Sequence, residues 1–345
     1  MILRMGEPDF ENAWENLMYS DPFCPPFFSK LGIRLEIECH RHREGICEDH
    51  SFIIALKGIP LLGMRIAAMA YEGSAAELSA YGHPVTLTQN RTVTISAEAF
   101  SELEKELDRL FAQFPGMVFR FRESLGNGEL TSLGHRLLAS GAEVRPRFTR
   151  VIDLQESADS LSASRRRRYK NLIAWGKKNV AVEFMTAQNA DADVFEQCHQ
   201  LHISQAGRET RNGASWDLQL ERIRAGEAYA VLGRIGGELV SFGYFAHTRT
   251  LALYYSSASR RDLFERAIFH APLWQSILHA KEIGCRWFEV GGLVFCGVGG
   301  APKKDQISQF KSGFGGTSRA QCDFSYRIPI QSEMSSEPSS PTTVS

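Results

Sequence analysis

The amino-acid sequence predicts an α/β protein with two domains, each built on a mixed sheet. The chain has 345 residues, which is about the length of two ordinary domains. Its two halves follow the same order of elements: a strand, a tight glycine turn, two further strands, a helix and a final strand. We therefore expect residues 1–154 and 155–331 to form the two domains.

In the first half, three runs have the apolar content of strands: residues 31–39, 51–56 and 61–71. Residues 96–114 form the clearest amphipathic helix, with Ser96 as its N-cap. The remaining elements are a strand over 117–122, a short helix over 130–140 that ends at Gly141, and a strand over 149–154.

In the second half, two helices are predicted over 193–207 and 216–225. A Gly236-Gly237 turn joins strands over 229–235 and 238–248, which is a strong hairpin signal. A strand over 251–257, a helix that begins at Pro272, and a strand that begins at Cys285 follow.

Composition narrows the class of protein. A net charge of −1, with 43% hydrophobic and 23% charged residues, describes a globular protein without general attraction to nucleic acid or acidic membranes. The N-terminus lacks the apolar region of a secretory signal. Residues 51–70 are apolar, but Lys57, Pro60 and Arg65 interrupt them, so we expect two strands rather than a membrane span.

Cysteine usage and the last residues complete this outline. Seven cysteines without framework spacing are expected to be reduced, which points to a cytoplasmic protein. Residues 332–345 have too little apolar content to pack, and we expect a disordered tail.

The stretch most closely linked to chemistry runs from Pro272 to Gly316. Its order of helix, strand, glycine-rich excursion and F-K-S-G-F-G-G segment places Glu289, Lys311 and several mobile glycines at the C-terminal end of a strand. Open α/β sheets bind ligands at this edge. Pro272 is expected at the first position of its helix, where free N–H groups can bind an anion. The hydroxyls and arginines of the preceding S-S-A-S-R-R segment suit a phosphate.

Together these features resemble the C-terminal domain of the Fem-type (FemABX-like) transferases, which carry two GNAT-like acyltransferase domains in tandem. The resemblance rests on the hairpin, the Y-Y-S-S-A-S strand end, the A-K-E-I-G-C helix end, the F-E-V-G-G strand end and the F-K-x-G-F-G-G segment. It covers residues 161–323 well, and only the architecture agrees before that. It implies transfer of an acyl or aminoacyl group to a primary amine, in a ternary complex and without a covalent enzyme intermediate.

The resemblance also implies roles for individual residues. Glu289 is the expected base or water-orienting group, and Lys311 the group that stabilises the carbonyl oxygen. The residues expected to bind the phosphates of the donor are Arg260, Arg261, Arg266 and Ser257. Those expected to line the substrate cleft are Tyr254, Tyr255, Phe310 and Arg168.

The donor is less closely defined than the reaction. Acyl-CoA with an amine of a cell-envelope glycan or sugar precursor is the preferred pair, and aminoacyl-tRNA for peptidoglycan-type synthesis is the alternative. A non-catalytic GNAT-fold binding protein is the rival from another class. Residues 260–267 lack the glycines with which acetyl-CoA-dependent GNAT domains approach a pyrophosphate, so the sequence leaves a CoA donor unproven. No tightly bound cofactor is expected.

Three further groups have both a functional and a structural interpretation. The basic run Arg165–Arg168, with Lys170, Lys177 and Lys178, suits phosphates of tRNA or of a nucleotide sugar, or a solvated helix face. The cysteines and histidines between Cys39 and His50 match no standard zinc spacing and straddle an expected turn near Gly45, so no metal site is expected. Cys198 and His202 share a helix face, where core packing explains them without nucleophilic chemistry.

Overall fold

The computed structural model describes residues 2–4, 6–20, 25–44, 47–56, 59–69, 77–80, 97–125, 129–294 and 302–330. The strands are β1 (Ile2–Arg4), β2 (Cys47–Leu56), β3 (Ile59–Met69), β4 (Glu77–Ala80), β5 (Val118–Ser124), β6 (Glu143–Asp153), β7 (Ala181–Met185), β8 (Ala228–Ile235), β9 (Glu238–His247), β10 (Leu251–Ser259), β11 (Trp287–Leu293) and β12 (Thr317–Arg327). The α-helices are α1 (Phe10–Ser20), α2 (Lys30–Glu44), α3 (Ala97–Phe111), α4 (Ser132–Ala139), α5 (Ala158–Ser164), α6 (Arg167–Asn179), α7 (Ala192–Ala206), α8 (Gly213–Arg224), α9 (His270–Glu282) and α10 (Pro302–Ser312).

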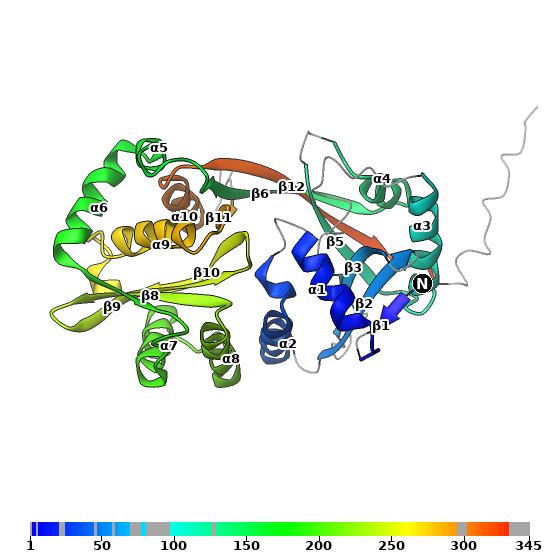
Figure 1. The fold of residues 1–345 in the computed structure, drawn as a ribbon, viewed down its shortest axis with the longest axis horizontal. Helices are drawn as coiled ribbons and strands as arrows, with labels where there is room; N and C mark the ends of the chain where they lie inside the picture. The colour runs from blue at the N-terminus through cyan, green and yellow to red at the C-terminus, as the bar shows by residue number, and fades with distance from the viewer. Residues whose placement is uncertain are drawn as a thin grey trace, which may run out of the picture.

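These strands form a 12-stranded sheet in the order β1-β2-β3-β4-β5-β12-β6-β11-β10-β9-β8-β7. Two lobes are visible, and the long strands β6 and β12 run from one to the other (Figure 1). The fold is therefore of the α/β class with a mixed sheet, as the sequence predicts.

The predicted repeat is present in the topology. In the first half β2, β3 and β4 pair antiparallel, and β5, which follows α3, lies parallel to β4. In the second half β8, β9 and β10 pair antiparallel, and β11, which follows α9, lies parallel to β10. Each half thus contains a unit of three antiparallel strands, a crossover helix and a fourth strand that lies parallel to the third.

The two halves exchange the strand that follows each unit. β6 comes after the first unit in the chain but pairs antiparallel with β11 of the second. β12 comes after the second unit but pairs antiparallel with β5 of the first. β6 and β12 also pair with each other from Thr317↔Val151 to Ser325↔Glu143. The core of the first half accordingly contains Phe324 of β12 beside Phe119 and Phe121 of β5.

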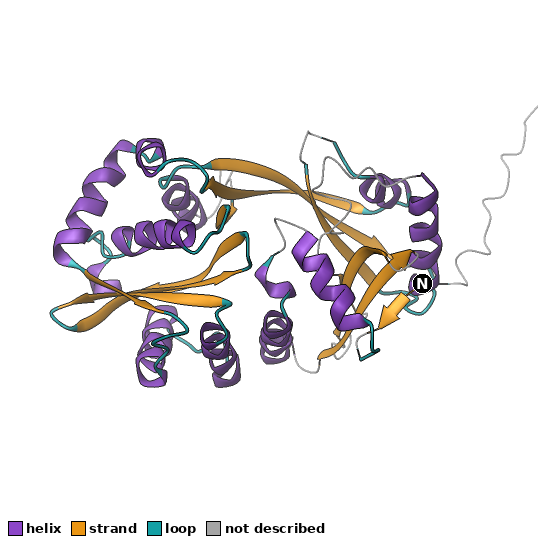
Figure 2. Ribbon diagram, viewed as in Figure 1, coloured by secondary structure: helices purple, strands orange, loops and turns teal. Residues whose placement is uncertain are grey.

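Helices cover both faces of the second lobe (Figure 2). α6 and α9 pack on one face, where Ile173, Leu273 and Ile277 join Phe288 in a buried cluster. α7 and α8 pack on the other face, where Trp216 lies against Phe242 in a second cluster. The apolar stripes of these helices account for their positions.

One predicted strand is wrong: residues 31–39 lie within helix α2. Apolar residues alternate in this stretch, which favoured a strand, yet Lys, Arg, Leu and Glu are all good helix formers. The Ser29 hydroxyl accepts a hydrogen bond from the Gly32 amide at 3.0 Å, as an N-cap does. Packing of α2 against α8 and the Pro26–Phe28 turn then decides the conformation.

Most other predicted elements are confirmed, with small changes at their ends. α9 begins at His270, so Pro272 is the third residue of the helix and not the first. Gly284 follows the helix with φ +91°, as its predicted place requires. Residues 51–70 contain β2 and β3, and among the described residues no helix is long and apolar enough to cross a membrane. Ser96 and the tail 332–345 lie outside the described residues, and the domain boundary at residue 154 stays a prediction.

Candidate active site

The parallel strands β10 and β11 part in the middle of the second lobe. They pair only at Leu251↔Trp287, Ala252↔Phe288 and Leu253↔Glu289. At that point both strands are irregular: β10 has a bulge against β9 at Tyr254/Ser256, and β11 has one against β6 at Glu289/Gly291. Bulges re-aim side chains and end pairing, so the main-chain groups of β10 and β11 beyond Leu253 and Glu289 no longer pair with each other.

Glu289 stands at the point where this pairing ends. Its neighbours Phe288 and Val290 belong to the core under α9, so alternation along β11 directs Glu289 to the opposite face of the sheet. There the hydroxyl of the buried Thr149 donates a hydrogen bond to Glu289 Oε1 at 2.7 Å. This bond fixes the direction of the carboxylate.

Lys311 lies at the end of α10 and reaches back to β11. Its Nζ donates a hydrogen bond to the Gly292 carbonyl at 3.0 Å. Gly291 has φ +100°, and a Cβ there would stand 2.9 Å from Lys311 Nζ, so glycine is needed both for its backbone conformation and for the approach of the ammonium. Burial lowers the pKa of Lys311, Glu289 raises it, and Arg147 lowers it. The carboxylate and the ammonium therefore lie within each other's field.

This electrostatic contact makes a measurable prediction. Replacing Glu289 by Gln removes the group that raises the pKa of Lys311, so we expect the pKa to fall further in this variant. The ammonium would then lose its proton at a lower pH than in the wild type. The pH titration of the Lys311 resonance in ¹³Cε-lysine NMR, assigned with Lys311→Arg, measures the shift. Glu143→Gln, which removes an exposed carboxylate at the start of β6, is the control. An unchanged titration in Glu289→Gln would contradict the contact.

The glycines of the F-K-S-G-F-G-G segment, expected to be mobile, are packed instead. A Cβ on Gly313 would stand 2.1 Å from the ring of Tyr169, and one on Gly315 would stand 2.3 Å from the Ser164 hydroxyl. The Gly313 carbonyl accepts a bond from the Arg166 amide at 3.0 Å. The segment thus packs closely against the α5–α6 junction. This packing fixes the position of the Lys311 backbone at the end of α10.

The predicted cleft aromatics separate onto two faces of the sheet. Tyr254 stacks on Phe245 in the core under α9, and its hydroxyl contacts the Ser257 hydroxyl. Burial raises the pKa of Tyr254 to about 12. Phe310 packs edge-on against His270 at 5.2 Å, on the same side. Tyr255 points to the other face, where its hydroxyl donates to Glu36 of α2 at 2.9 Å.

Arg260 and Arg261, two of the predicted phosphate ligands, already have protein partners. Arg260 forms ion pairs with Glu238 at 2.7 Å and Asp262 at 2.6 Å. Arg261 Nε donates to the Gln205 carbonyl at 2.8 Å. To hold a donor phosphate, these two would exchange those partners. Arg266 is exposed beside them, and a donor role for all three stays a prediction.

The basic run is divided by the break between α5 and α6. Arg165 lies over the Trp274 ring at 4.0 Å and donates to the Ser162 carbonyl, so it has a structural role. Arg166, Arg167 and Arg168 are exposed at the start of α6. Burial lowers the pKa of the neighbouring His270 to about 4, with Arg168 acting in the same direction. The exposed arginines remain available to a phosphate.

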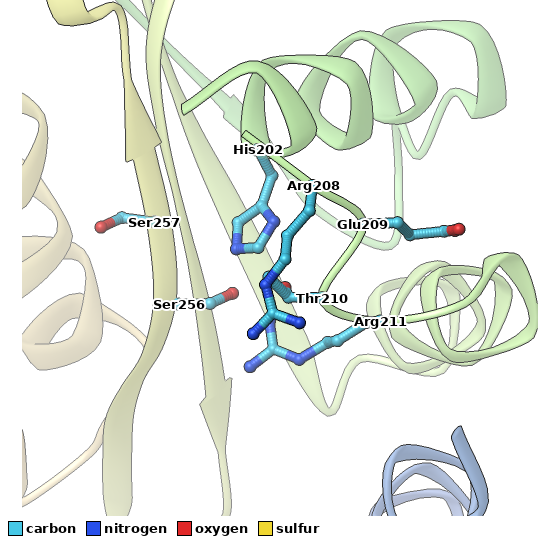
Figure 3. Close-up of a pocket in the computed structure, with 7 residues that line it drawn as sticks. All are labelled: His202, Arg208, Glu209, Thr210, Arg211, Ser256 and Ser257. Atoms are coloured by element: carbon cyan, nitrogen blue, oxygen red, sulfur yellow. The ribbon is translucent and has the colours of Figure 1, made fainter. Parts of the chain in front are cut away.

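A basic pocket of about 630 Å³ opens on the other side of β10. Its lining residues are His202, Arg208, Glu209, Thr210, Arg211, Ser256 and Ser257. In Figure 3 the two guanidinium groups converge beside His202 and Ser256, whereas Glu209 points away. Arg211 Nη1 and Ser256 Oγ are buried and have no hydrogen-bond partner among the described residues. Buried polar groups are seldom left unpaired, so these two atoms indicate a place for a ligand.

Sequence reasoning missed Arg208, Arg211 and Glu36. Arg208 and Arg211 stand in the short G-R-E-T-R-N segment between two predicted helices. Two arginines in a loop that ends at a helix N-cap were a usable signal for an anion site. Glu36 gave no such signal, because its stretch was predicted as a strand.

Cys198 lies in the core, whereas His202 on the same helix lines the basic pocket. Burial raises the pKa of Cys198 to about 12, which leaves an inert thiol in the core, as predicted. Cys39 is buried in α2, and the side chains of residues 40–50 lie outside the described ones. Within the described part of the chain, no group of three or more His, Cys, Asp or Glu is placed to hold a metal ion.

Comparison with known proteins identifies the fold. No protein-family model matches the sequence, and no curated protein matches it. FemX has a similar structure, with a TM-score of 0.69 and 12% identity over 96% of this chain and 98% of that chain. A tandem GNAT protein from the clavulanic acid biosynthesis pathway gives a TM-score of 0.53 and 14% identity over 96% and 99%. A conserved protein from Bacteroides thetaiotaomicron gives 0.57 and 9% over 95% and 100%. The chain therefore has the tandem GNAT-like fold that its resemblance to Fem-type proteins predicts.

Proposed function

We propose that this protein is an acyltransferase that moves an acyl group from an activated donor to a primary amine of a phosphate-bearing glycan or sugar precursor. The observation that carries the proposal is that Lys311 is bound to the Gly292 carbonyl, three residues along β11 from Glu289, beside the point where the pairing of β10 and β11 ends. The tandem GNAT-like fold supports a transferase of this type.

The reaction follows from the chemistry of these two groups. The amine nitrogen attacks the donor carbonyl carbon, and its proton passes to Glu289 directly or through water. The carbonyl oxygen gains negative charge, which the Lys311 ammonium stabilises. The new C–N bond then replaces the C–S bond of a thioester or the C–O bond of an ester, and the leaving group takes up a proton. No covalent bond to the protein is needed.

The basic pocket supplies the binding site for the acceptor in this scheme. Ser256 lies three residues beyond Leu253, the residue that pairs with Glu289. At about 3.3 Å per residue, this places the pocket roughly 10 Å from the reacting groups. Arg208 and Arg211 would hold the phosphate of the acceptor. Its amine, about one sugar ring away from that phosphate, would then reach Glu289. Arginine pairs suit this task because their planar groups bind phosphate oxygens in pairs.

Acyl-CoA is the preferred donor, and aminoacyl-tRNA is the second. The exposed arginines Arg166–Arg168 at the start of α6 favour the second, because an exposed basic run suits the phosphates of tRNA. Both donors present a carbonyl carbon bonded to a good leaving group, a thiol in acyl-CoA and a ribose hydroxyl in aminoacyl-tRNA. The same amine attack and the same two side chains therefore suit either donor.

A donor and acceptor assay tests the function. The purified protein is incubated with acetyl-CoA or with aminoacyl-tRNA, and with amino sugars that either carry or lack a phosphate. We expect product, detected by mass spectrometry, with one donor class and only with phosphate-bearing amines. Loss of turnover after RNase treatment identifies the tRNA donor. Ligand binding without turnover of either donor would instead support a non-catalytic binding protein.

A further inference from the structure

Helix α2 of the first half lies against the loop that carries the basic pocket of the second half. It runs beside α8, between the two lobes (Figure 1). Asn212, the N-cap of α8, donates its Nδ2 hydrogen to Glu38 Oε1 at 2.6 Å, while its own oxygen accepts from the Ser215 amide. The end of the pocket loop is therefore held by α2.

Tyr255 connects α2 to the arginine of the pocket. The Arg211 guanidinium lies 5.1 Å from the centre of the Tyr255 ring, a cation–π contact. The hydroxyl at the far end of the same ring donates to Glu36 Oε1 at 2.9 Å. Burial raises the pKa of Tyr255, and Glu36 acts in the same direction, so the phenol keeps its proton and remains a donor. The ring is fixed at one end by Glu36 and supports Arg211 on its face.

Arg211 depends on this support because its other contacts are few. Its Nη1 is buried without a hydrogen-bond partner among the described residues. Within the same part of the chain, no carboxylate forms an ion pair with it or with Arg208. Without Tyr255 held in place, the guanidinium has little to keep it aimed into the pocket.

We infer that Glu36 is a positioning residue for the anion site, acting through Tyr255 on Arg211, so that the first half of the chain completes the binding pocket of the second. The inference rests on the proposed role of the pocket in binding a phosphate. It gives the first half a part in recognition of the acceptor.

The experiment measures binding of inorganic pyrophosphate to the full chain by isothermal titration calorimetry. Arg211→Gln tests the pocket itself. Tyr255→Phe removes only the hydroxyl and keeps the ring under Arg211, and Glu36→Ala removes the acceptor of its hydrogen bond. The variant that carries both Tyr255→Phe and Glu36→Ala completes a double-mutant cycle. Glu36→Gln keeps an acceptor oxygen and is the rescue variant. Glu221→Gln breaks the exposed Arg34–Glu221 pair between α2 and α8 and is the matched control.

We expect Arg211→Gln to weaken binding by about tenfold or more, the range of a lost hydrogen bond to a charged group. Tyr255→Phe and Glu36→Ala should each weaken it about three- to tenfold, and the double variant by no more than one of them, because the two residues act in series. Glu36→Gln and Glu221→Gln should bind within about twofold of the wild type.

The outcomes separate the two claims. Wild-type binding no tighter than that of Arg211→Gln overturns the anion pocket, and this inference with it. Loss in Arg211→Gln but wild-type binding in Tyr255→Phe and Glu36→Ala overturns only the role of Glu36. Thermal unfolding of each variant identifies any that fails to fold. If Glu36→Ala is one of these, unaltered binding in Tyr255→Phe alone overturns the inference.

Discussion

Replacing Lys311 with alanine is expected to lower kcat/KM for acyl transfer by about 10²–10³, the usual loss when a donor to a developing oxyanion is removed. The ammonium is half-buried and already hydrogen-bonded to the Gly292 carbonyl, so its position does not have to be established during the reaction. Most of the loss should appear in kcat, because the charge on the carbonyl oxygen develops only in the transition state.

Two comparisons make this result specific. Lys105→Ala removes an exposed lysine of α3, in the other lobe, and should leave turnover unchanged. Binding of pyrophosphate by Lys311→Ala should match the wild type, since the pocket of Arg211 is separate. Steady-state kinetics with the productive donor measures the effect. Activity within about threefold of the wild type would rule out a direct role for Lys311.

Gly316→Ala should destabilise the protein by about 2–5 kcal/mol, from a left-handed backbone conformation and an overpacked contact. Gly316 has φ +76°, and a Cβ there would stand 2.3 Å from the Val151 carbonyl oxygen. That atom belongs to the backbone of β6 and cannot move aside as a flexible side chain can. Chemical denaturation followed by circular dichroism measures the free energy of unfolding.

Gly237→Ala is the matched control for this prediction. Gly237 has a similar φ of +87°, but nothing lies within 4 Å of the position its Cβ would take. Its substitution should cost about 1–2 kcal/mol, the conformational part alone. Equal losses in the two variants would mean that the contact between Gly316 and β6 contributes little.

Local patterns predicted most elements because their causes are local. The Gly236-Gly237 turn determines its hairpin, since both residues have positive φ. The apolar stripe of α3 determines its buried face, with Leu103, Leu107 and Leu110 in the core. The strand prediction for residues 31–39 failed because alternating apolar residues fit both a strand and a helix that is buried on two sides. Contacts of α2 with α8, far away in the sequence, decide between them.

The candidate site was predictable only in part for the same reason. The order of helix, strand and F-K-S-G-F-G-G segment indicated Glu289 and Lys311, and in the structure Lys311 is bound to the Gly292 carbonyl, three residues along β11 from Glu289. The bond from Thr149 to Glu289 joins residues 140 positions apart, and no local pattern signals it. The pocket of Arg211 likewise depends on α2, whose position follows from the tertiary packing. A sequence can indicate which residue types suit a reaction, but the fold decides which of them meet.

The exchange of β6 and β12 also governs how the chain can assemble during synthesis. β12 occupies the space between β5 and β6, yet it is synthesised long after both of them. Until then, the nascent first half exposes the edge of β5, and Phe119 and Phe121 lack the partner that Phe324 supplies. The pairing of β5 with β12, from Gln321↔Ser124 to Arg327↔Val118, joins distant parts of the chain, and such non-local pairing is slow to form. The two lobes, although each resembles a complete folding unit, must therefore finish folding together.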